Sequence, residues 1–483
     1  MAYVRKVKTK SGATAVQVAY KHWGKIVRID HIGSAHTEEK LQLLIALARQ
    51  RIWGSQPSLF DPIPLQVTIG LKHTASTVLL KTLSDLYKKL GFTLLNDPDF
   101  GYLCIARLVE PTSKLESLRV LSDLGLNGVD KNRLYRCLRR VNTGDYRSKL
   151  AAQCFKQAQK SGITLVLYDV TSLYFEVQKE DEYRKPGMSK ERRLEPQIVI
   201  GLLVDQSGFP LEIQSFEGNK AETKTILPVV EQFAARHSVT DITVVADAAM
   251  LSRSNLEAIS SAGYHYIVGS RLSKIPYDIA DYQDHAQMVD NQILTVQTET
   301  EGQRIIYQYR AKRAALDKRN IDKQIAKAEK IVTGRAPASK AKFLKVTTKE
   351  KKLNQLLIDK ARALAGIKGY VTNLNISDER VIAYYHQLWQ VEKSFRMSKS
   401  DLKARPVFHR KQESIEAHLT VVFAALAIGR TIERLTGLSL RQVIKTLKPI
   451  RSGTVVIEGK EYQAEPMIPE DVAQLIEKLQ DTN

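Results

Sequence analysis

The sequence of 483 residues has little cysteine, no apolar leader and no apolar run long enough to cross a membrane. Its three cysteines, Cys104, Cys137 and Cys154, lack CxxC spacing and cannot all pair, so we expect buried thiols, a reducing compartment and no zinc site. The N-terminal stretch MAYVRKVKTKSG does not resemble a secretory signal. The apolar run at 419–428 is about half a membrane span and predicts a buried core helix. We therefore expect a cytoplasmic protein without a membrane partner.

Acidic residues are too few to balance the basic ones. The 73 Lys and Arg residues exceed the 52 Asp and Glu residues, which leaves a formal charge of +21. Such an excess favours a polyanionic partner, with nucleic acid ahead of an anionic membrane surface. The stretch 304–352 contains sixteen basic and four acidic residues, so more than half of the excess lies there. We expect a long basic helix that binds the phosphate backbone through Lys318, Arg319 and Lys323; the alternative is a solvated charged helix.

Hydrophobic patterning predicts an order of segments along the chain. We expect a β-rich region with one helix near 37–52 first, and successive helices after it. Together these would form an N-terminal DNA-binding region made of strands and helices. The expected segments are a β-rich region (1–72), a helical DNA-binding region (73–160), the first part of an α/β core (161–274), a basic insertion domain (275–365), the second part of the core (366–435) and a C-terminal region (436–483).

The helical region contains a basic helix after a glycine-containing turn. Asp130 is a plausible N-cap for the helix KNRLYRCLRRV, and a leucine stripe marks the helix before the turn. This arrangement is compatible with a helix-turn-helix that contacts phosphates through Arg133 and Arg136. The alternative is an ordinary helical hairpin with a solvated basic face, which the pattern fits equally well.

The predicted core alternates strands and helices. Apolar strands are expected at 163–170, 197–205, 210–218, 242–247 and 264–270, with helices near 223–236 and 253–262. The second and third strands should form a hairpin around the turn QSGF. This order predicts an α/β fold with a mixed sheet and matches an RNase H-like domain. A long helix at about 378–400, capped by Ser377, and a second helix near 411–435 should follow.

Three acids stand out in this core. Asp169 follows the apolar run LVLY, Asp247 follows TVVA, and Glu392 lies in the middle of the long helix. Adjacent strands would bring Asp169 and Asp247 together, and such carboxylates repel each other unless a cation lies between them. Oxygen ligands suit Mg²⁺ or Mn²⁺, and two such ions can support in-line phosphoryl displacement. Singly, each aspartate could instead be a turn former or a helix cap.

The helix around Glu392 has one face with a mixed character. Tyr385, Leu388, Glu392, Phe395 and Lys399 share this face at helical spacing. A pure core stripe would not place a glutamate at its centre and a lysine two turns later. We therefore expect apolar support around one acid, with Lys399 positioned to hold a phosphate as a point charge.

These segments resemble the DDE transposases of bacterial insertion sequences, in the IS-four-like group with a Tyr-x2-Arg-x3-Glu-x6-Lys signature. Tyr385, Glu392 and Lys399 match that signature, whereas Leu388 stands in the place of its arginine, for which Arg396 is a candidate substitute. The segments YDVTSLYFE, GLLVDQSGFPLEIQSFEGNKAET, VVADAAMLS and LWQVEKSFRMSKSDLKARPVFH carry the resemblance, which runs from about 163 to 430.

The resemblance implies a function and a site. Asp169, Asp247 and Glu392 would be the catalytic triad, with a mainly β insertion domain between the last two. The protein would be a prokaryotic, DNA-associated enzyme that binds terminal inverted repeats of double-stranded DNA as a homodimer. It would then move its element to target DNA by cutting and pasting, often through a DNA hairpin.

Several further residues have two interpretations. Asn219 and Lys220 follow the predicted hairpin and could approach DNA or simply form a polar loop. Trp389 could stack on a displaced base, although packing in the core is the favoured interpretation. His409 and His418 are expected to be structural rather than metal ligands.

Two alternatives to an active transposase stay open at this stage. One is an RNase H-like, structure-selective nuclease such as a junction resolvase, which would share the metal site but lack strand transfer. The other is a non-catalytic DNA-binding protein derived from a transposase. The long insertion and the Tyr, Glu and Lys helix argue against the first, and three intact acids argue against the second.

Overall fold

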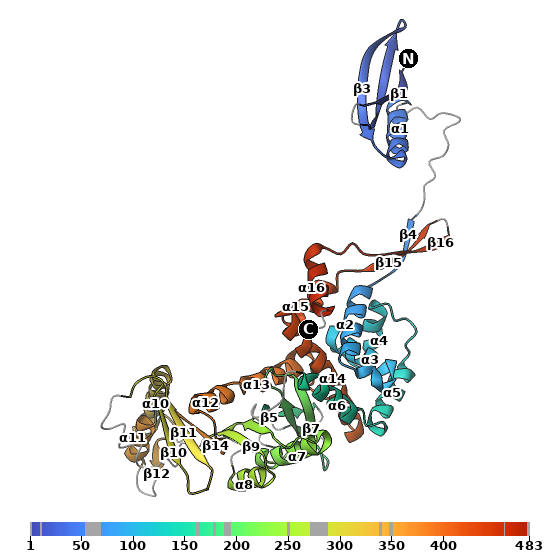
Figure 1. Cartoon of the computed structure of the whole chain (residues 1–483). Helices are drawn as coiled ribbons and strands as arrows, with labels where there is room; N and C mark the ends of the chain where they lie inside the picture. Colours follow the sequence, from blue (N-terminus) through green and yellow to red (C-terminus); the bar gives the residue numbers. More distant parts are fainter. Residues whose placement is uncertain are drawn as a thin grey trace. The chain divides into compact units, whose positions relative to one another are not determined.

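The computed structural model describes residues 2–9, 12–53, 69–160, 165–176, 180–187, 195–248, 252–270, 288–337, 341–346, 351–457 and 459–480. It divides into two compact units (Figure 1). The smaller unit comprises Met1–Gly70 with Val456–Lys460, and the larger comprises Leu71–Val455 with Glu461–Asn483.

The smaller unit is an antiparallel three-stranded sheet with one helix. Its elements are β1 (Ala2–Lys8), β2 (Thr14–His22), β3 (Lys25–Ala35) and α1 (Glu38–Trp53). Val16 and Val18 of β2 are fully buried against Leu44 and Ala48 of α1, as expected for alternate residues of a half-covered strand. The helix expected near 37–52 is α1. The expected strand LQVTIG lies mostly outside the described residues.

The larger unit begins within a small strand, whose first two residues belong to the smaller unit, and continues with a helical bundle. The elements are β4 (Ile69–Ala75), α2 (Thr77–Lys89), η1 (Phe92–Leu95), α3 (Pro98–Val109), α4 (Ser117–Asp123), α5 (Lys131–Thr143) and α6 (Tyr146–Gln159). Asp130 caps α5 as predicted, because its carboxylate accepts from the Arg133 backbone N–H at 3.0 Å. The three cysteines are buried free thiols, also as predicted.

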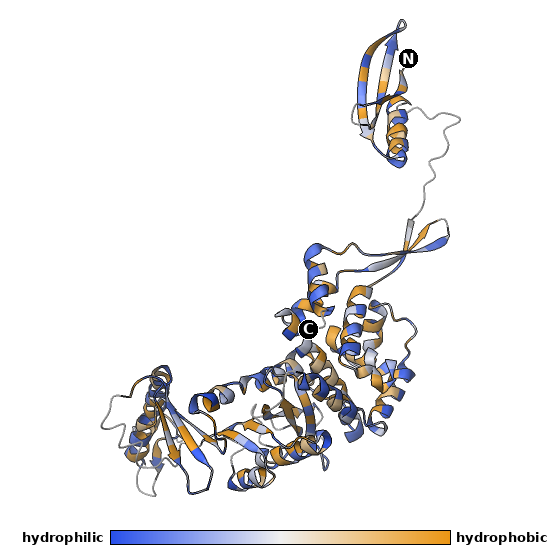
Figure 2. Ribbon diagram, viewed as in Figure 1, coloured by the Kyte–Doolittle hydropathy of each residue, from blue (hydrophilic) through white to orange (hydrophobic). Residues whose placement is uncertain are grey.

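A mixed eight-stranded sheet forms the centre of the larger unit. Its strands are β5 (Leu165–Tyr174), β6 (Gln197–Val204), β7 (Pro210–Glu217), β8 (Thr243–Ala246), β9 (His265–Gly269), β10 (Ile293–Gln297), β11 (Arg304–Tyr309) and β14 (Ile367–Thr372). The order is β10-β11-β14-β9-β8-β5-β6-β7, with β8 parallel to β5 and β9 and the other pairs antiparallel. The predicted α/β class, the mixed sheet and the β6–β7 hairpin are confirmed. The central strands are mostly apolar because the sheet is covered (Figure 2).

Helices cover both faces of this sheet. On one side lie α7 (Ile226–His237), which follows the short η2 (Glu222–Lys224), and α8 (Arg253–Ser261) (Figure 1). On the other lie α12 (Asp378–His386), α13 (Trp389–Arg396) and η5 (Met397–Asp401). Side chains alternate along β5, so Tyr168 points toward Thr225 at the start of α7, and Asp169 points away from it.

The expectation of one long helix at 378–400 was wrong. Ser377 caps α12 as expected, but the helix breaks at Gln387 and Leu388, and a π-helical turn follows α13. The two halves pack on different strands: α12 on β8, β9 and β14, and α13 on β5 and β6. Because the strands of a sheet twist, one straight helix could not follow both sets.

The segment between β9 and β14 contains the predicted long basic helix, α10 (Ala311–Val332). Strand β11 pairs with β14, and β10 pairs with β11, so both strands extend the core sheet. Together with β12 (Leu344–Val346), β13 (Lys351–Leu353) and α11 (Gln355–Ala363), α10 surrounds a small core of Ile321, Phe343 and Ile358.

The C-terminal part contains α14 (Gln412–Thr436), α15 (Leu440–Leu447), β15 (Ser452–Ile457), β16 (Lys460–Ala464) and α16 (Glu470–Gln480). By length and composition α14 could cross a membrane, but 94% of its apolar window is buried inside the protein. It packs against α3, α5 and β7. The prediction of a buried core helix around 419–428 is therefore confirmed.

Candidate active site

Strand register brings Asp169 and Asp247 to neighbouring positions. In the parallel pair of β5 and β8, Tyr168 lies opposite Ala246, so the two aspartates follow at the next step of each strand. Adjacent strands are about 4.8 Å apart. The strand expected at 163–170 continues further, to Tyr174, because β6 pairs with β5 that far. β8 stops at Ala246, one residue before Asp247.

Tyr385 of α12 joins this pair. Its hydroxyl donates to the Asp247 Oδ1 atom at 3.2 Å, and the same oxygen accepts from the Ala248 backbone N–H at 2.7 Å. Burial, followed by the negative charges of Asp247 and Asp169, raises the pKa of Tyr385. The phenol therefore stays protonated and acts as a hydrogen-bond donor beside both acids.

Glu392 lies on the exposed side of α13, whereas its neighbours Val391, Ser394 and Phe395 are buried. The helix packs on β5, the strand of Asp169. The five residues of the expected mixed face are divided over α12, the break after it, α13 and the π-helical turn. Leu388, at the place of the signature arginine, is buried and only 8% exposed, so the signature's cation is absent from that position.

Lys399 approaches the site from the π-helical turn. Its ammonium donates to the hydroxyl of Thr171, which is buried on β5. Because Thr171 is two residues from Asp169, both side chains are on the same face of the strand. The structure therefore places Lys399 beside the strand of the first acid.

Lys368 of β14 is a site residue that the sequence did not reveal. Its ammonium lies 4.3 Å from the ring centroid of Tyr385. Burial and the charge of Arg313 lower its pKa, while the carboxylates of Asp247 and Glu392 oppose that shift. Lys368 thus shares one electrostatic environment with two of the three acids. The only sequence signal is a lysine in an otherwise apolar strand, and strand pairing alone brings it here.

The donors around the three acids are oxygen atoms, as magnesium or manganese would require. Among the residues that the structure describes, no group of three His, Cys, Asp or Glu side chains converges closely enough to hold a metal ion. Asp169 and Asp247 are neighbours in register, and Glu392 is exposed on the adjoining helix. The two aspartates are thus near each other, but the three carboxylates do not form a closed ligand cluster.

The predicted DNA contacts fall on several surfaces. Lys318, Arg319 and Lys323 are exposed on α10, without an ion-pair partner among the described residues. Asn219 is exposed and Lys220 is partly exposed in the turn after β7.

The basic helix α5 is partly engaged within the protein. Arg136 is exposed, but Arg133 pairs with Asp99 of α3 at 2.7 Å. Arg140 likewise pairs with Asp97 at 2.8 Å. Because α5 packs on α3, part of its basic face neutralises buried acids, and Arg133 has less freedom to bind phosphate than Arg136.

Two further expectations concern aromatic and histidine side chains. Trp389 is 55% exposed, so the favoured interpretation of a core tryptophan was wrong. It begins α13, one turn before Glu392. His418 is buried, with its Nε2 atom 3.3 Å from the Ala404 carbonyl oxygen, which fits the expected structural role. Burial lowers the pKa of His409 to about 4.

Comparisons with known proteins place the chain in a family. The sequence profile of the family described as "Transposase DDE domain" matches residues 160–428, which is more than half of the chain and includes the three acids. None of the curated proteins matches the chain. Among solved structures, the cryo-EM structure of a piggyBac transposase synaptic complex with hairpin DNA is similar over 77% of this chain and 79% of that chain. The identity is 11% and the TM-score 0.41, a level that does not establish a shared fold.

Proposed function

The chain belongs to the transposase family defined by the DDE domain, and on that premise we propose that it cuts the ends of a bacterial insertion sequence and joins them to target DNA. The observation that carries this proposal is the placement of Asp169 beside Asp247, with the hydroxyl of Tyr385 on the Asp247 carboxylate. This pairing of acids from adjacent parallel strands lies within the segment that matches the family.

We propose Asp169, Asp247 and Glu392 as the ligands of divalent metal, with two ions of Mg²⁺ or Mn²⁺ at work. The donor set fits such ions because it is made of carboxylate oxygens, two of them in neighbouring strand positions. When bound, the ions would activate the attacking oxygen and stabilise the leaving oxygen of an in-line displacement. No covalent protein nucleophile is needed.

The other residues of the site would orient the acids or bind the DNA phosphate. Tyr385 holds the Asp247 carboxylate by donating to its Oδ1 atom. Lys399, next to Thr171, would bind the phosphate near the scissile bond as a point charge. Lys368 would limit the repulsion between Asp247 and Glu392. A water oxygen would attack the phosphodiester and release a 3′-hydroxyl, which would then attack the other strand or target DNA.

DNA binding in this proposal uses the exposed cations around the site. The candidates are Arg396, Lys220 with Asn219, Arg136 with Arg133, and the α10 residues Lys318, Arg319 and Lys323. The exposure of Trp389 now favours stacking on a nucleobase near the cut. Two protomers would pair the two ends of the element in the cytoplasm. The three positions Tyr385, Glu392 and Lys399 support membership of the IS-four-like signature group.

A cleavage assay tests this proposal directly. Purified protein is incubated with linear DNA that carries the terminal repeats flanking its gene, with Mg²⁺ or with EDTA, and the products are separated on a gel. We expect metal-dependent cuts at the repeat ends, followed by joined products. Binding without cutting in either condition would indicate a non-catalytic DNA-binding protein. Cutting of a four-way junction without any joining would indicate a structure-selective nuclease.

A further inference from the structure

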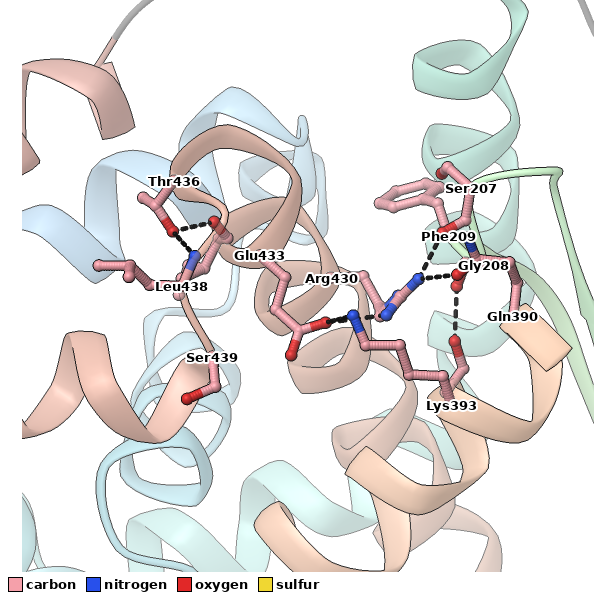
Figure 3. A network of polar contacts seen from close by, with 12 residues as sticks. Ser207, Gly208, Phe209, Gln390, Lys393, Arg430, Glu433, Thr436, Leu438 and Ser439 are labelled. Atoms are coloured by element: carbon pink, nitrogen blue, oxygen red, sulfur yellow. Dashed lines mark hydrogen bonds and ion pairs between the residues drawn. The ribbon is translucent and has the colours of Figure 1, made fainter.

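The short helix α13, which carries Glu392, is attached to the rest of the protein through the residues on either side of that acid (Figure 3). Gln390 and Lys393 contact side chains of α14, and Ser394 contacts the turn between β6 and β7. α13 has eight residues, is not continuous with α12 and passes directly into the π-helical turn η5. A helix of this length has little stability of its own, so its orientation depends on such tertiary contacts.

Arg430 of α14 is the centre of these contacts. Its side chain is only 6% exposed. One guanidinium nitrogen donates to Glu433 Oε2 at 2.8 Å. The second terminal nitrogen, Nη2, donates to Gln390 Oε1 at 2.9 Å and to the Ser207 carbonyl oxygen. One buried cation thus joins α14, the β6–β7 turn and the helix of Glu392.

Glu433 supplies the opposite charge and a second link. Its Oε2 atom accepts from both Arg430 and Lys393, the latter at 2.9 Å, as Figure 3 shows. Its side chain is 13% exposed. A buried cation without its acid would be strongly destabilising, so Arg430 and Glu433 hold each other in place and both hold α13.

The β6–β7 turn is shaped to receive Arg430. Ser394 donates its hydroxyl to the Gly208 carbonyl oxygen at 2.7 Å. The Asp205 carboxylate closes the turn by accepting from the Ser207 and Phe209 backbone N–H groups at 2.8 and 2.9 Å. Gly208 has φ +82°, and a Cβ there would overlap the Arg430 guanidinium and lie 3.0 Å from the Gln390 carbonyl oxygen. Only glycine satisfies both the backbone and the contact.

The attached residues lie on the side of α13 away from Glu392. At about 100° per residue, Gln390, Lys393 and Ser394 span roughly a third of the helix circumference, and Glu392 lies outside that arc. The contacts therefore hold the helix on the side opposite Glu392. They leave Glu392 exposed, which agrees with its position at the surface. A rotation of α13 about its axis that moves the carboxylate would also disrupt these hydrogen bonds.

We infer that Arg430 is a positioning residue, which sets the rotation of α13 and thereby aims Glu392 at Asp169 and Asp247. The inference rests on the proposed function only in that Glu392 is taken as a metal ligand. A site of this kind tolerates little displacement, because metal ligands must hold their geometry closely. Arg430 itself touches neither DNA nor metal in this proposal.

The test compares two variants of the full-length protein that each break a buried ion pair. Arg430→Met removes the link to α13. Arg236→Met is the matched control, because Arg236 pairs with Glu212, whose side chain is 1% exposed, in α7 and β7. Hydrogen exchange of the α13 amides at 389–396 is measured together with that of α12, and cleavage is measured over a range of Mg²⁺ and Mn²⁺ concentrations.

We expect exchange at 389–396 to accelerate at least about tenfold in Arg430→Met and to stay unchanged in Arg236→Met. Cleavage with Mg²⁺ should fall about tenfold or more, with a higher Mg²⁺ requirement, partial rescue by Mn²⁺ and little change in DNA affinity. Arg430→Lys should restore part of the activity, because a lysine can still reach Glu433. Gln390→Ala, a milder change, should show the same pattern to a smaller degree.

Three results separate this inference from the proposed function. Unchanged exchange at 389–396 in both Arg430→Met and Gln390→Ala would overturn the positioning role, whether or not the protein cleaves DNA. Equal loss of cleavage in Arg430→Met and Arg236→Met at equal loss of thermal stability would also overturn it. Absence of metal-dependent cleavage in the wild-type protein would instead overturn the proposed function.

Discussion

Tyr385 donates a hydrogen bond to Asp247 over 3.2 Å, although 138 positions of sequence separate them. The first residue lies on α12 and the second follows β8, and α12 packs on that strand. This contact links the signature helix to the acid pair on the sheet. It also shows why the segment between them can be long, since β10, β11 and β14 continue the same sheet toward α12.

The first prediction concerns Asp247. Asp247→Asn keeps the shape of the side chain but removes its charge, so metal can no longer be held between the acids. We expect cleavage to fall by more than about a thousandfold, with DNA affinity within about twofold because no phosphate contact is lost. Asp241→Asn, an exposed acid just before β8, is the control and should cleave normally. Retained cleavage by purified Asp247→Asn would remove Asp247 from the metal site.

A second prediction concerns the hydroxyl of Tyr385. Tyr385→Phe keeps the buried ring and its contact with Lys368 but loses the donor to Asp247. A hydrogen bond to a charged group is worth about 1.5–3 kcal/mol, so the cleavage rate should fall about tenfold or more. Tyr384→Phe, which removes the hydroxyl that accepts from Arg380, should have no such effect. Equal rates for both variants in single-turnover assays would show that the hydroxyl does not orient Asp247.

A third prediction follows from the exposed ring of Trp389. Stacking on a base is worth about 1–3 kcal/mol, so Trp389→Ala should weaken binding of terminal-repeat DNA by about fivefold or more. Because the ring is 55% exposed, the melting temperature should change little. Trp389→Phe should recover part of the affinity. A large loss of thermal stability with unchanged affinity would favour the packing role instead.

The cations of α10 give a fourth prediction. Replacing Lys318, Arg319 and Lys323 by glutamine should lower DNA affinity and reduce the slope of log affinity against log salt by up to about 2.7, which is about 0.9 for each lost phosphate contact. The control variant removes the same number of charges from α15 and α16. It replaces three exposed residues there by glutamine, namely Arg441, Lys445 and Lys478. An unchanged salt slope in the α10 variant, measured by fluorescence anisotropy, would mean that α10 does not touch DNA.

A fifth prediction concerns acid stability. Burial and then the charge of Arg236 lower the pKa of His237 to about 4, from an ordinary value of 6.5. The folded state therefore binds fewer protons than the unfolded state between these values. The stability from neutral His237 is complete above about pH 6.5 and is lost as the pH falls toward 4.

His237→Phe tests this contribution. The ring stacks on Phe155 at 4.1 Å, and its buried Nε2 atom has no hydrogen-bond partner within the described part of the chain, so phenylalanine suits the site. We expect the free energy of unfolding in urea to fall less steeply between pH 6.5 and 4 in this variant, whereas His36→Asn, an exposed change, should leave the slope alone. The same slope in wild type and His237→Phe would contradict the assignment.

Much of the core could be predicted because its signals are local. The apolar runs that became β6, β7, β8 and β9 need no distant partner to be recognised, and neither do the caps at Asp130 and Ser377. The three acids were visible as charges at unusual places in apolar patterns. The sequence segments around the three acids were specific enough to suggest a DDE transposase, and the match to the family profile supports this.

The sequence by itself therefore determined the α/β class, the candidate acids and the excess of positive charge, because composition and short-range periodicity encode them. Tertiary structure decided the rest. Only strand register makes Asp169 the neighbour of Asp247, and only the order β14-β9-β8 brings Lys368 near them. The break between α12 and α13 depends on which strands each half contacts, and the link from Arg430 to Gln390 spans forty positions. Such contacts depend on where the folded chain passes, which no local pattern records.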